Sequence, residues 1–407
     1  MVEAIKKNPD ATRPFHKKGW SVSRWIFLGS ILLTVLAWVI GYLSNGADVL
    51  PLVPEVLPGA TRIEARNTLY IGYDQQGHMI GYAALGQGQG YGGPMEMLVG
   101  VDPAGNIVGV KIISQRETPG FFRLVLQENF IDQFLGKQAT APLAIGQDID
   151  AASGATLSSE GVAASIRQAV RVAAQEGLNT NIPPENRPIQ FGIPEITILG
   201  LYAAGYFGHK LNNSVWKKRI RWSTLLVGMV VLGFIYTIPF TISQVITLLS
   251  GYWPDWHNNL YWYLLIGGIL FVTTVDAKNP YCSWFCPFGA VQECLAQVTQ
   301  AKFFRPRKWR DLFVWLQRGL AFTAILLGLA LRRPGIAGYE PFATLFDLRG
   351  NTIQWIFLAI ILFASLLMYR PFCNYLCPLD PIFDFIREGR RWILEIWHLW
   401  HKKLAKP

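Results

Sequence analysis

Six apolar runs, each close to the length that crosses a bilayer, constrain the fold of this chain more than any other feature. A membrane-spanning helix needs about 20 predominantly apolar residues, because it rises about 1.5 Å per residue through a hydrocarbon core about 30 Å thick. The runs are residues 25–43, 192–208, 222–242, 260–275, 312–331 and 352–369. They predict an α-helical membrane protein with about six spans, of which the third extends or bends near Pro239.

Basic residues beside the runs predict the orientation of the chain. Lys and Arg number six in residues 1–24, five in 209–221, six in 277–311 and seven in 370–407. The alternate loops hold few of them, none in residues 251–259 and three in residues 332–351. Because cytoplasmic loops carry the excess of basic residues, we expect a multi-pass protein of the cell inner (cytoplasmic) membrane, embedded in lipid, with N- and C-termini in the cytoplasm.

The long polar stretch between the first two runs then lies outside the cytoplasm, in the periplasm of a cell with two membranes. Residues 44–188 contain nine Lys and Arg against fourteen Asp and Glu, a net charge of −5, although the whole chain carries +10. The positive charge stands in short blocks beside apolar runs, which indicates membrane topology and no nucleic-acid partner. We expect three parts, namely residues 1–46 with the first span, a periplasmic domain (47–187) and a five-span domain (188–407).

The first run allows a second interpretation, a cleaved signal peptide. Ser44, Asn45 and Gly46 form a tolerable small-x-small cleavage site. The run is longer than the apolar region of a typical signal peptide, and this length favours a retained membrane helix.

The periplasmic domain has the pattern of an α+β fold. Residues 68–85 and 95–113 each predict strand, turn and strand, with Gln-Gln-Gly and Pro-Ala-Gly-Asn at the turns. Residues 159–177 combine a helical period with good helix formers and a terminal glycine, and they predict a helix. Residues 44–60 are rich in Pro and Leu and predict a linker from the first span.

A small, polar stretch before that helix presents Thr156 directly after Ser153, Gly154 and Ala155. The free N–H groups and the positive dipole end of a helix N-terminus suit a phosphate, and the small residues leave room for it and for a modifying enzyme. Taken alone, such a stretch is most often a loop with an N-cap serine. The Gly-rich residues 86–93 are likewise either a flexible loop or a backbone that lies against a flat ring, and Pro119-Gly120 fits a tight turn.

Three stretches of this domain together resemble the FMN-binding domains of the RnfG and NqrC subunits. They are residues 91–102, 117–121 and 150–156, which read YGGPMEMLVGVD, ETPGF and DAASGAT. The resemblance implies an FMN whose phosphate is joined to the Thr156 oxygen by a phosphoester bond that a flavin transferase makes. It also implies these cofactor-binding residues: Tyr91, Gly92, Gly93, Glu117, Thr118, Pro119, Gly120, Ser153, Gly154 and Ala155.

The membrane part contains a repeated cysteine motif. NPYCSWFCP and RPFCNYLCP align with an offset of 91 residues at both cysteines, so Cys282 and Cys286 correspond to Cys373 and Cys377. Four thiolates suit an iron–sulfur cluster or zinc, and thiols or a disulfide without metal are the third alternative. The proline after each second cysteine favours a helix start there, and Cys-Pro also ends the bacterial ferredoxin run.

The fifth cysteine, Cys294, is expected to lie outside this site. It follows Cys286 by eight residues, which is about 12 Å along a helix that opens at Pro287. Metal–thiolate bonds are only about 2.3 Å long, and the repeat places Phe385 at the position equivalent to Cys294.

The two motifs, joined to an outer flavin domain by a span, resemble NosR-type regulators and RdhC-type proteins over nearly the whole chain. This sequence departs from the NosR pattern because no Cys-x-x-Cys-x-x-Cys segment follows the last span, and its second motif continues as CPLDP. The resemblance implies electron transfer from a cytoplasmic donor or a quinol, through the cluster and FMN, to a periplasmic oxidoreductase. The alternative is a redox-sensing regulator or maturation factor for a periplasmic reductase of the nitrous-oxide-reductase or reductive-dehalogenase type.

Other polar residues add less. The six histidines all lie away from the centres of the apolar runs, which argues against a b-type haem. Arg318 lies within a run, where it either extends to the membrane surface or compensates the charge of an anionic cluster, and Glu195 is expected to reach water. Cysteines on the cytoplasmic side and flavin on the other leave the thickness of the membrane between the two cofactors, so we expect a middle carrier, a quinone or a moving domain.

Overall fold

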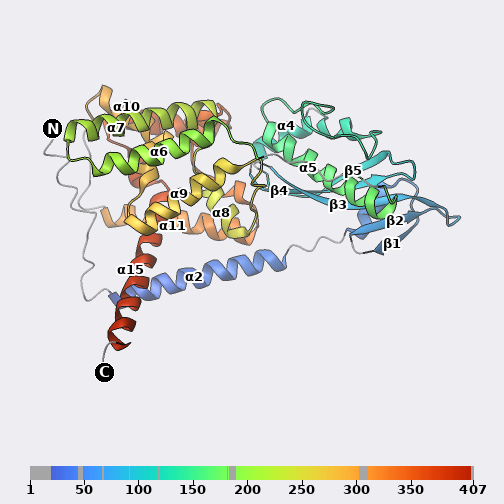
Figure 1. Cartoon of the computed structure of the whole chain (residues 1–407), viewed down its shortest axis with the longest axis horizontal. Helices are drawn as coiled ribbons and strands as arrows, with labels where there is room; N and C mark the ends of the chain where they lie inside the picture. The colour runs from blue at the N-terminus through green and yellow to red at the C-terminus, as the bar shows by residue number, and fades with distance from the viewer. Residues whose placement is uncertain are drawn as a thin grey trace.

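The computed structural model describes residues 20–44, 49–66, 68–90, 92–117, 119–127, 129–180, 182, 189–301 and 310–404. They form two bodies that lie end to end, as Figure 1 shows. We call residues 49–180 the α+β domain, and helix α2 together with residues 189–404 the helical domain. The fold is thus mostly helical with one small sheet, which confirms the coarse fold class.

The α+β domain is built on a five-stranded antiparallel sheet whose strands follow the order of the sequence. They are β1 Arg62–Arg66, β2 Leu69–Tyr73, β3 Met79–Gln89, β4 Pro94–Val101 and β5 Ile107–Gln115. The two predicted hairpins are confirmed, since β2 pairs with β3 and β4 with β5. Gly77 and Gly105 in their turns have φ of +84° and +86°, a conformation that glycine adopts at no steric cost.

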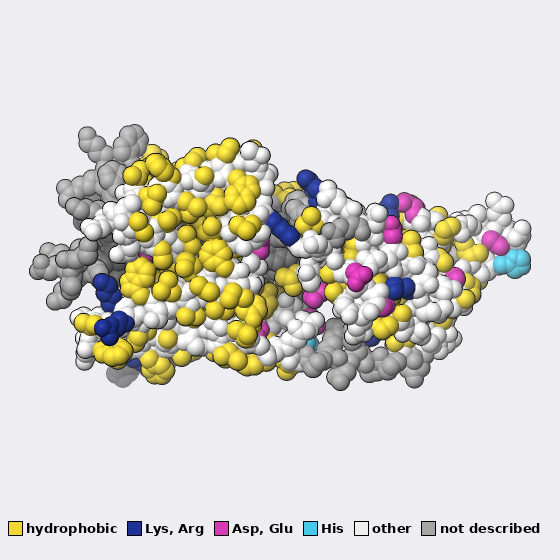
Figure 2. Space-filling view, turned by 90° about the horizontal axis from the view of Figure 1, so that it is seen from above, with side chains coloured by type: hydrophobic (Ala, Val, Ile, Leu, Met, Phe, Trp, Pro, Cys, Tyr) yellow, Lys and Arg dark blue, Asp and Glu magenta, His cyan; other side chains and the backbone are white. Residues whose placement is uncertain are grey.

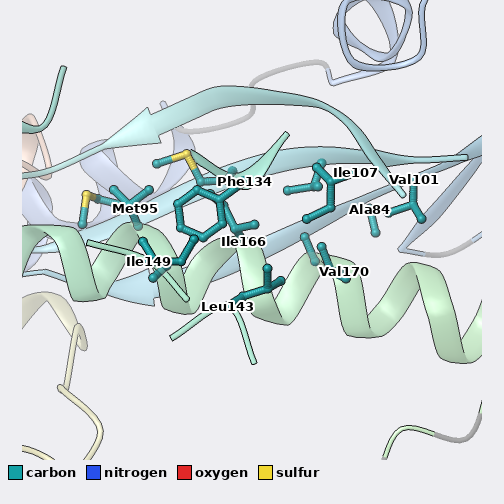
Figure 3. Close-up of a cluster of buried hydrophobic side chains, with 14 of the residues drawn as sticks. Ala84, Met95, Val101, Ile107, Phe134, Leu143, Ile149, Ile166 and Val170 are labelled. Atoms are coloured by element: carbon teal, nitrogen blue, oxygen red, sulfur yellow. The ribbon is translucent and has the colours of Figure 1, made fainter. Parts of the chain in front are cut away.

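Helix α5, Thr156–Val172, lies across one face of the sheet and confirms the predicted helix. Ile166 and Val170 point from it into a core that Ala84, Val101 and Ile107 share (Figure 3). Other segments close this core, including α4 Pro119–Gln127, the 3-10 helix η3 Phe130–Phe134 and the π-helical turn η4 Ala173–Gly177.

The first part of the Gly-rich stretch packs beneath α5, and of the two alternatives the flexible loop is wrong for it. Gly86 and Gly88 belong to β3. A methyl group on Gly86 would lie 2.0 Å from the carbonyl oxygen of Ser165, and one on Gly88 would lie 2.1 Å from that of Gly161. These glycines are therefore needed for the close approach of helix to strand.

The other face of the sheet is covered by the start of the domain. The 3-10 helix η2 Leu50–Leu52 leads into α3 Val53–Val56, whose Val53 and Val56 pack against Ala83 and Leu98. The predicted linker is therefore wrong for residues 49–57, because its apolar side chains complete a second small core. Residues 45–48 lie outside the described residues.

The helical domain has a helix at each of the six apolar runs. They are α2 Trp20–Leu43, α6 Ile193–Lys210, α7 Ser214–Val227 with its π-helical continuation η5 Gly228–Ile235, α9 Leu260–Asp276, α11 Arg310–Ala330 and α13 Thr352–Leu367. Among the described residues, two segments are long and apolar enough to cross a membrane, Arg24–Leu43 and Asp311–Ala330, and α9 and α13 are shorter apolar helices. Six spans therefore stay a prediction.

Shorter elements connect these helices, and a long helix follows the last of them. The short ones are α8 Ile242–Ser250, the π-helical η6 Tyr281–Phe285, α10 Pro287–Val298, the 3-10 helix η7 Pro334–Ile336, α12 Phe342–Phe346 and α14 Pro371–Tyr375, and the long one is α15 Leu379–Leu404. At the end of the helical domain far from the α+β domain, α15 meets α2, where Phe385 stacks on Phe27 with ring centroids 4.3 Å apart (Figure 1). The opposite end of α2 lies against α11, since a methyl group on Gly41 would be 2.3 Å from the Leu329 carbonyl oxygen.

Two local predictions are wrong. Glu195 is only 5% exposed, because its carboxylate accepts a hydrogen bond of 2.8 Å from the Gly192 N–H and caps its own helix instead of reaching water. Pro119-Gly120 opens α4 and does not form a tight turn. Proline fits the first turn of a helix because N–H groups there make no hydrogen bond within the helix, so the N–H that proline lacks is not missed.

Candidate cofactor sites

Thr156 is the first residue of α5 and lies on the surface. Ser153 and Gly154 before it are exposed as well, and Gly154 has φ of +70°, whereas Ala155 is buried. The Ala152 N–H donates to the Ser159 hydroxyl oxygen at 3.0 Å, which holds the preceding loop against the first turn of the helix. The Thr156 hydroxyl is thus presented at an accessible helix N-terminus, where a negative charge is stabilised.

The other two flavin-like stretches meet each other beside α5. The Gly92 N–H donates to the Glu117 carboxylate at 2.5 Å, and Glu117 is 4% exposed. Gly90 touches α5, since a methyl group on Gly161 would lie 2.8 Å from the Gly90 nitrogen. Gly93 is buried, and Pro119 and Gly120 open α4, whereas Tyr91 and Thr118 lie outside the described residues.

A cavity of about 1280 Å³ lies beside these residues, between the two domains. The α+β domain contributes Gly90, Gly92, Leu157 and Glu160 to its wall, among others. The helical domain contributes segments around Thr241, Asn259, Glu340 and Arg349. Burial raises the pKa of Glu340 to about 7 although the Ile242 N–H donates to that carboxylate at 2.6 Å.

Two arginines join the domains, and one of them, Arg349, lines this cavity. Arg116, next to Glu117, donates to the carbonyl oxygens of Leu331 and Arg332, and its guanidinium lies 5.5 Å from the ring centroid of Tyr252. Arg349 reaches in the other direction, from the helical domain. Its guanidinium packs on Gly154, where a methyl group would lie 1.2 Å from Nη2.

The four repeated cysteines line one cavity of about 2700 Å³ in the helical domain. Cys286 is the N-cap of α10, as the Cys-Pro pattern predicts, and α15 starts at Leu379, one residue after Pro378. The repeat is also structural, because the Cys286 N–H donates to the Tyr281 carbonyl oxygen at 2.8 Å and the Cys377 N–H to that of Phe372 at 2.9 Å. The 91-residue offset thus relates two similar turns.

The motifs fold back into the bundle. Tyr281 is fully buried, and the Phe240 N–H donates to its hydroxyl oxygen at 2.7 Å. The Tyr339 hydroxyl donates to the Leu376 carbonyl oxygen at 2.9 Å. Phe240 and Tyr339 precede α8 and α12, elements whose residues also line the cavity between the domains. The cysteine turns therefore pack against segments that lead into the wall of the cavity between the domains.

Burial dominates the acid–base behaviour of the four thiols. It raises the pKa of Cys373 to about 12 and that of Cys282 and Cys377 well above the usual range, and the neighbouring thiols add to the rise. Within the described ranges, no group of three or more His, Cys, Asp or Glu side chains is arranged closely enough to hold a metal ion as it stands. A bound metal deprotonates its thiol ligands and reverses this pKa pattern.

Polar side chains surround the thiols. The Gln292 amide donates to the Cys373 sulfur at 3.2 Å, and its oxygen accepts from the Phe372 N–H at 3.0 Å. The Gln317 amide donates to the Cys377 carbonyl oxygen at 2.8 Å. Hydrogen bonds to sulfur and to the ligand loop are among the features that set the potential of an iron–sulfur centre.

Arg370 is the cation nearest to this site. Its side chain is 12% exposed, donates to the Cys282 carbonyl oxygen at 2.9 Å and pairs with the buried Glu293 at 3.1 Å. Arg318 instead pairs with Asp384 at 3.4 Å, in a more exposed position. Arg370 is therefore better placed than Arg318 to compensate the charge of a cluster, and its only sequence signal is its place at the start of the second motif. A search for charges inside apolar runs misses it.

Cys294 stands apart from the four. It lies on α10 but does not line their cavity. Burial raises the pKa of its thiol, and the negative charge of Glu293 adds to the rise. Arg349 and Glu340 are the other residues that the sequence does not single out. Both lie in a loop between apolar runs, and only the contact between the domains brings them to a site.

The chain matches two domain families. Residues 90–171 match the FMN-binding domain, and residues 258–310 and 354–398 match the 4Fe-4S binding domain. The first match covers α5 with the Gly90 turn, and the second covers both cysteine pairs. Among solved structures, NqrC of Shewanella oneidensis aligns with 30% of this chain and 70% of its own, at 20% identity and a TM-score of 0.22.

Curated relatives match different parts of the chain. Protein NirI of Paracoccus denitrificans and the regulatory protein NosR of Pseudomonas aeruginosa are each 29% identical over 42% of this chain, which is 28% and 26% of their own length. A subunit of the proton-translocating ferredoxin:NAD(+) oxidoreductase complex of Clostridium ljungdahlii is 34% identical over 22% of this chain and 52% of its own. This chain thus spans about half of that oxidoreductase subunit and about a quarter of NirI and NosR. With both domain families present in one chain, this protein is similar to the NosR-type proteins and carries an FMN-binding domain and a 4Fe-4S binding domain.

Proposed function

We propose that this chain is a membrane-bound electron-transfer flavoprotein, a component of a pathway rather than a stand-alone catalyst. Electrons enter from a quinol or a cytoplasmic donor, pass through an iron–sulfur centre and covalent FMN, and leave to a periplasmic oxidoreductase. The observation that carries the proposal is the union of an FMN-binding and a 4Fe-4S binding domain in one chain. Iron, sulfide and flavin content of the purified protein, with optical spectra before and after reduction, tests it.

The flavin part of the proposal assigns the attachment site to Thr156. An exposed hydroxyl at a helix N-terminus suits a phosphoester, and the guanidinium of Arg349 packs two residues away. The residues present therefore fit the phosphate of FMN. Attachment requires a flavin transferase, and the exposure of Ser153, Gly154 and Thr156 leaves the site open to one.

The metal part of the proposal assigns Cys282, Cys286, Cys373 and Cys377 as cluster ligands. A common cavity, two sulfur-bearing turns at helix starts and the adjacent Arg370 suit an anionic four-thiolate cluster. Zinc and metal-free thiols are the competing assignments. Equal iron and acid-labile sulfide in the purified protein supports the cluster, whereas stoichiometric zinc or iron-free protein contradicts it.

The large cavity supports a quinol as donor. It extends from the cysteines to α2, α11 and α15, with apolar side chains such as Phe27, Phe322 and Ile325 in its wall. A quinol has a polar ring and a long apolar tail, which suit such a cavity in a membrane. Anaerobic mixing with a short-chain quinol should reduce the protein, and a failure to do so while viologen succeeds would favour the cytoplasmic donor.

The proposal includes a six-span topology in the inner membrane, with both termini in the cytoplasm. The arrangement of charges and the apolar surface of the helical domain support it. Reporter fusions near residue 100 should behave as exported. Membrane-impermeant thiol reagents applied to intact cells should leave the native protein unlabelled, and an inward-facing α+β domain would contradict the direction of electron flow.

A regulator or maturation factor is the second candidate, because relatives are named regulatory proteins. The two candidate functions use the same cofactors and differ in whether electrons flow continuously through them. Sustained turnover with the periplasmic partner reductase and an electron donor supports electron supply. A single reduction of the cofactors, with no reductase turnover, supports a sensor.

A further inference from the structure

One buried side chain, Phe342, lines both of the large cavities. It is the first residue of α12 and is 2% exposed. On one side of it lies the cavity that holds the four cysteines, and on the other side lies the cavity between the domains. Among the described residues, this aromatic side chain is thus the one that lines both the cysteine cavity and the cavity between the domains.

The cysteine turns pack directly on this residue. The ring centroid of Phe288, two residues after Cys286, lies 5.0 Å from that of Phe342. The ring centroid of Phe372, the neighbour of Cys373, lies 6.0 Å from it. Each repeat thus contributes one ring to a small aromatic wall beside its cysteines.

The α+β domain meets the helical domain at Arg349, which lines the cavity between the domains as Phe342 does. Its guanidinium fills the space at Gly154 where a side chain would be, two residues before Thr156. A phosphate on the Thr156 oxygen carries negative charge at this point, and arginine binds phosphate through paired N–H groups. From there the cavity extends past Leu157 and Glu160 of α5 to Glu340 and Phe342, and its volume of about 1280 Å³ is ample for a three-ring flavin.

We propose that FMN on Thr156 is clamped between the two domains, with its phosphate at Arg349 and its ring in the cavity between the domains. Electrons then cross the Phe342 side chain directly from the cluster to the flavin. This rests on the proposed function. In each step the cluster loses one electron and is oxidised, and the flavin gains it. Two such electrons, with two protons from water, complete the reduction of the flavin. The arrangement removes the need for the middle carrier that the sequence suggests.

Fluorescence of the attached flavin in the purified full-length chain tests the clamp. We compare Arg349→Gln with Arg333→Gln, an exposed arginine of the same loop that lines neither cavity. Acrylamide, a neutral quencher, should quench the flavin several-fold more strongly in Arg349→Gln and equally in Arg333→Gln and wild type. Arg349→Lys keeps the charge and should fall between. Reoxidation of the reduced cluster by the flavin should slow at least tenfold in Arg349→Gln.

The controls separate this inference from the proposed function. Fluorescence on a denaturing gel should persist in all three variants, because none of them changes Thr156. A wild-type protein without gel fluorescence overturns the proposed function itself. Wild-type flavin that is attached but equally quenched in Arg349→Gln and Arg333→Gln overturns only the clamp, as does loss of attachment in Arg349→Gln, which would assign Arg349 to the flavinylation step.

Discussion

The two domains place their apolar side chains in opposite ways. In the α+β domain, core residues such as Met97 and Val99 are fully buried, and charged side chains dot the surface (Figure 2). In the helical domain, apolar side chains spread over the surface, with Phe271 65% and Ile353 77% exposed. Contiguous apolar surface of this extent marks contact with lipid or another protein. One chain thus presents a water-facing half and a half that suits a bilayer.

The two candidate cofactor sites also differ in their exposure to solvent. Thr156 is exposed at a helix start, where an enzyme can attach a cofactor after folding. The cysteines lie inside the bundle, at turns whose backbone hydrogen bonds repeat across 91 residues. A buried cluster must be inserted before or during packing. The comparison predicts that the two cofactors are lost independently.

The largest effect is expected from the cysteines. Replacing any one of Cys282, Cys286, Cys373 or Cys377 by alanine should remove most of the bound iron, because each is assigned as a ligand, while flavin stays attached. Cys294→Ala is the matched control and should keep iron near the wild-type level. Metal analysis and gel fluorescence measure both, and iron loss in a folded Cys294→Ala protein would refute the four-cysteine assignment.

The reciprocal change is Thr156→Val, which removes the hydroxyl and keeps the shape of the side chain. It should abolish flavin fluorescence on a denaturing gel and leave iron unchanged. Ser153→Ala, three residues earlier, is the control and should retain most of the fluorescence. A fluorescent Thr156→Val protein would place the attachment elsewhere.

A smaller effect should follow from the cation beside the thiols. Arg370→Gln should lower the reduction potential of the cluster by on the order of 50 mV, because the reduced cluster carries one more negative charge and loses a nearby cation. Arg318→Gln removes a cation that is more exposed to solvent, and should shift the potential less. A potentiometric titration followed by cluster absorbance measures this, and equal shifts would contradict the assigned role of Arg370.

The sequence predicts more of the helical domain's elements than of its sites. Apolar runs predict helices such as α9 and α13 nearly to the residue, since composition alone determines burial in lipid or core. The inward fold of the cysteine turns depends on contacts between Tyr281 and Phe240, forty-one residues apart. Contacts between residues so far apart in the sequence produce no local pattern of apolar residues. Sequence analysis therefore places the two cofactors on opposite sides of the membrane.

The α+β domain shows the same limit on a smaller scale. Its hairpins follow from turn chemistry, and α5 follows from helical period. The role of Gly86 and Gly88 does not follow from a local pattern. A glycine that allows a helix to approach a strand closely looks the same in the sequence as a glycine in a flexible loop. Arg349 is likewise visible only once the domains meet.

The smallest effect concerns pH. Burial raises the pKa of Glu340 from 4.5 to about 7, so the folded state binds its proton more tightly than the unfolded state does. Its contribution to stability is present below pH 4.5 and is lost as pH rises through about 7. The loss is on the order of 3 kcal/mol, at about 1.4 kcal/mol per pKa unit. The thermal midpoint of Glu340→Gln should therefore vary less than that of wild type between pH 5 and pH 8, and identical profiles would contradict this.

The central claim is that the two halves exchange electrons, and one rapid-mixing measurement tests it most directly. Less than one electron equivalent of reduced viologen is added to the anaerobic protein, and cluster and flavin absorbance are followed together. In wild type, cluster absorbance should bleach and then recover with the rate constant at which flavin absorbance falls. In Thr156→Val the cluster bleach should persist. A wild-type cluster that stays reduced beside an oxidised flavin would contradict the account.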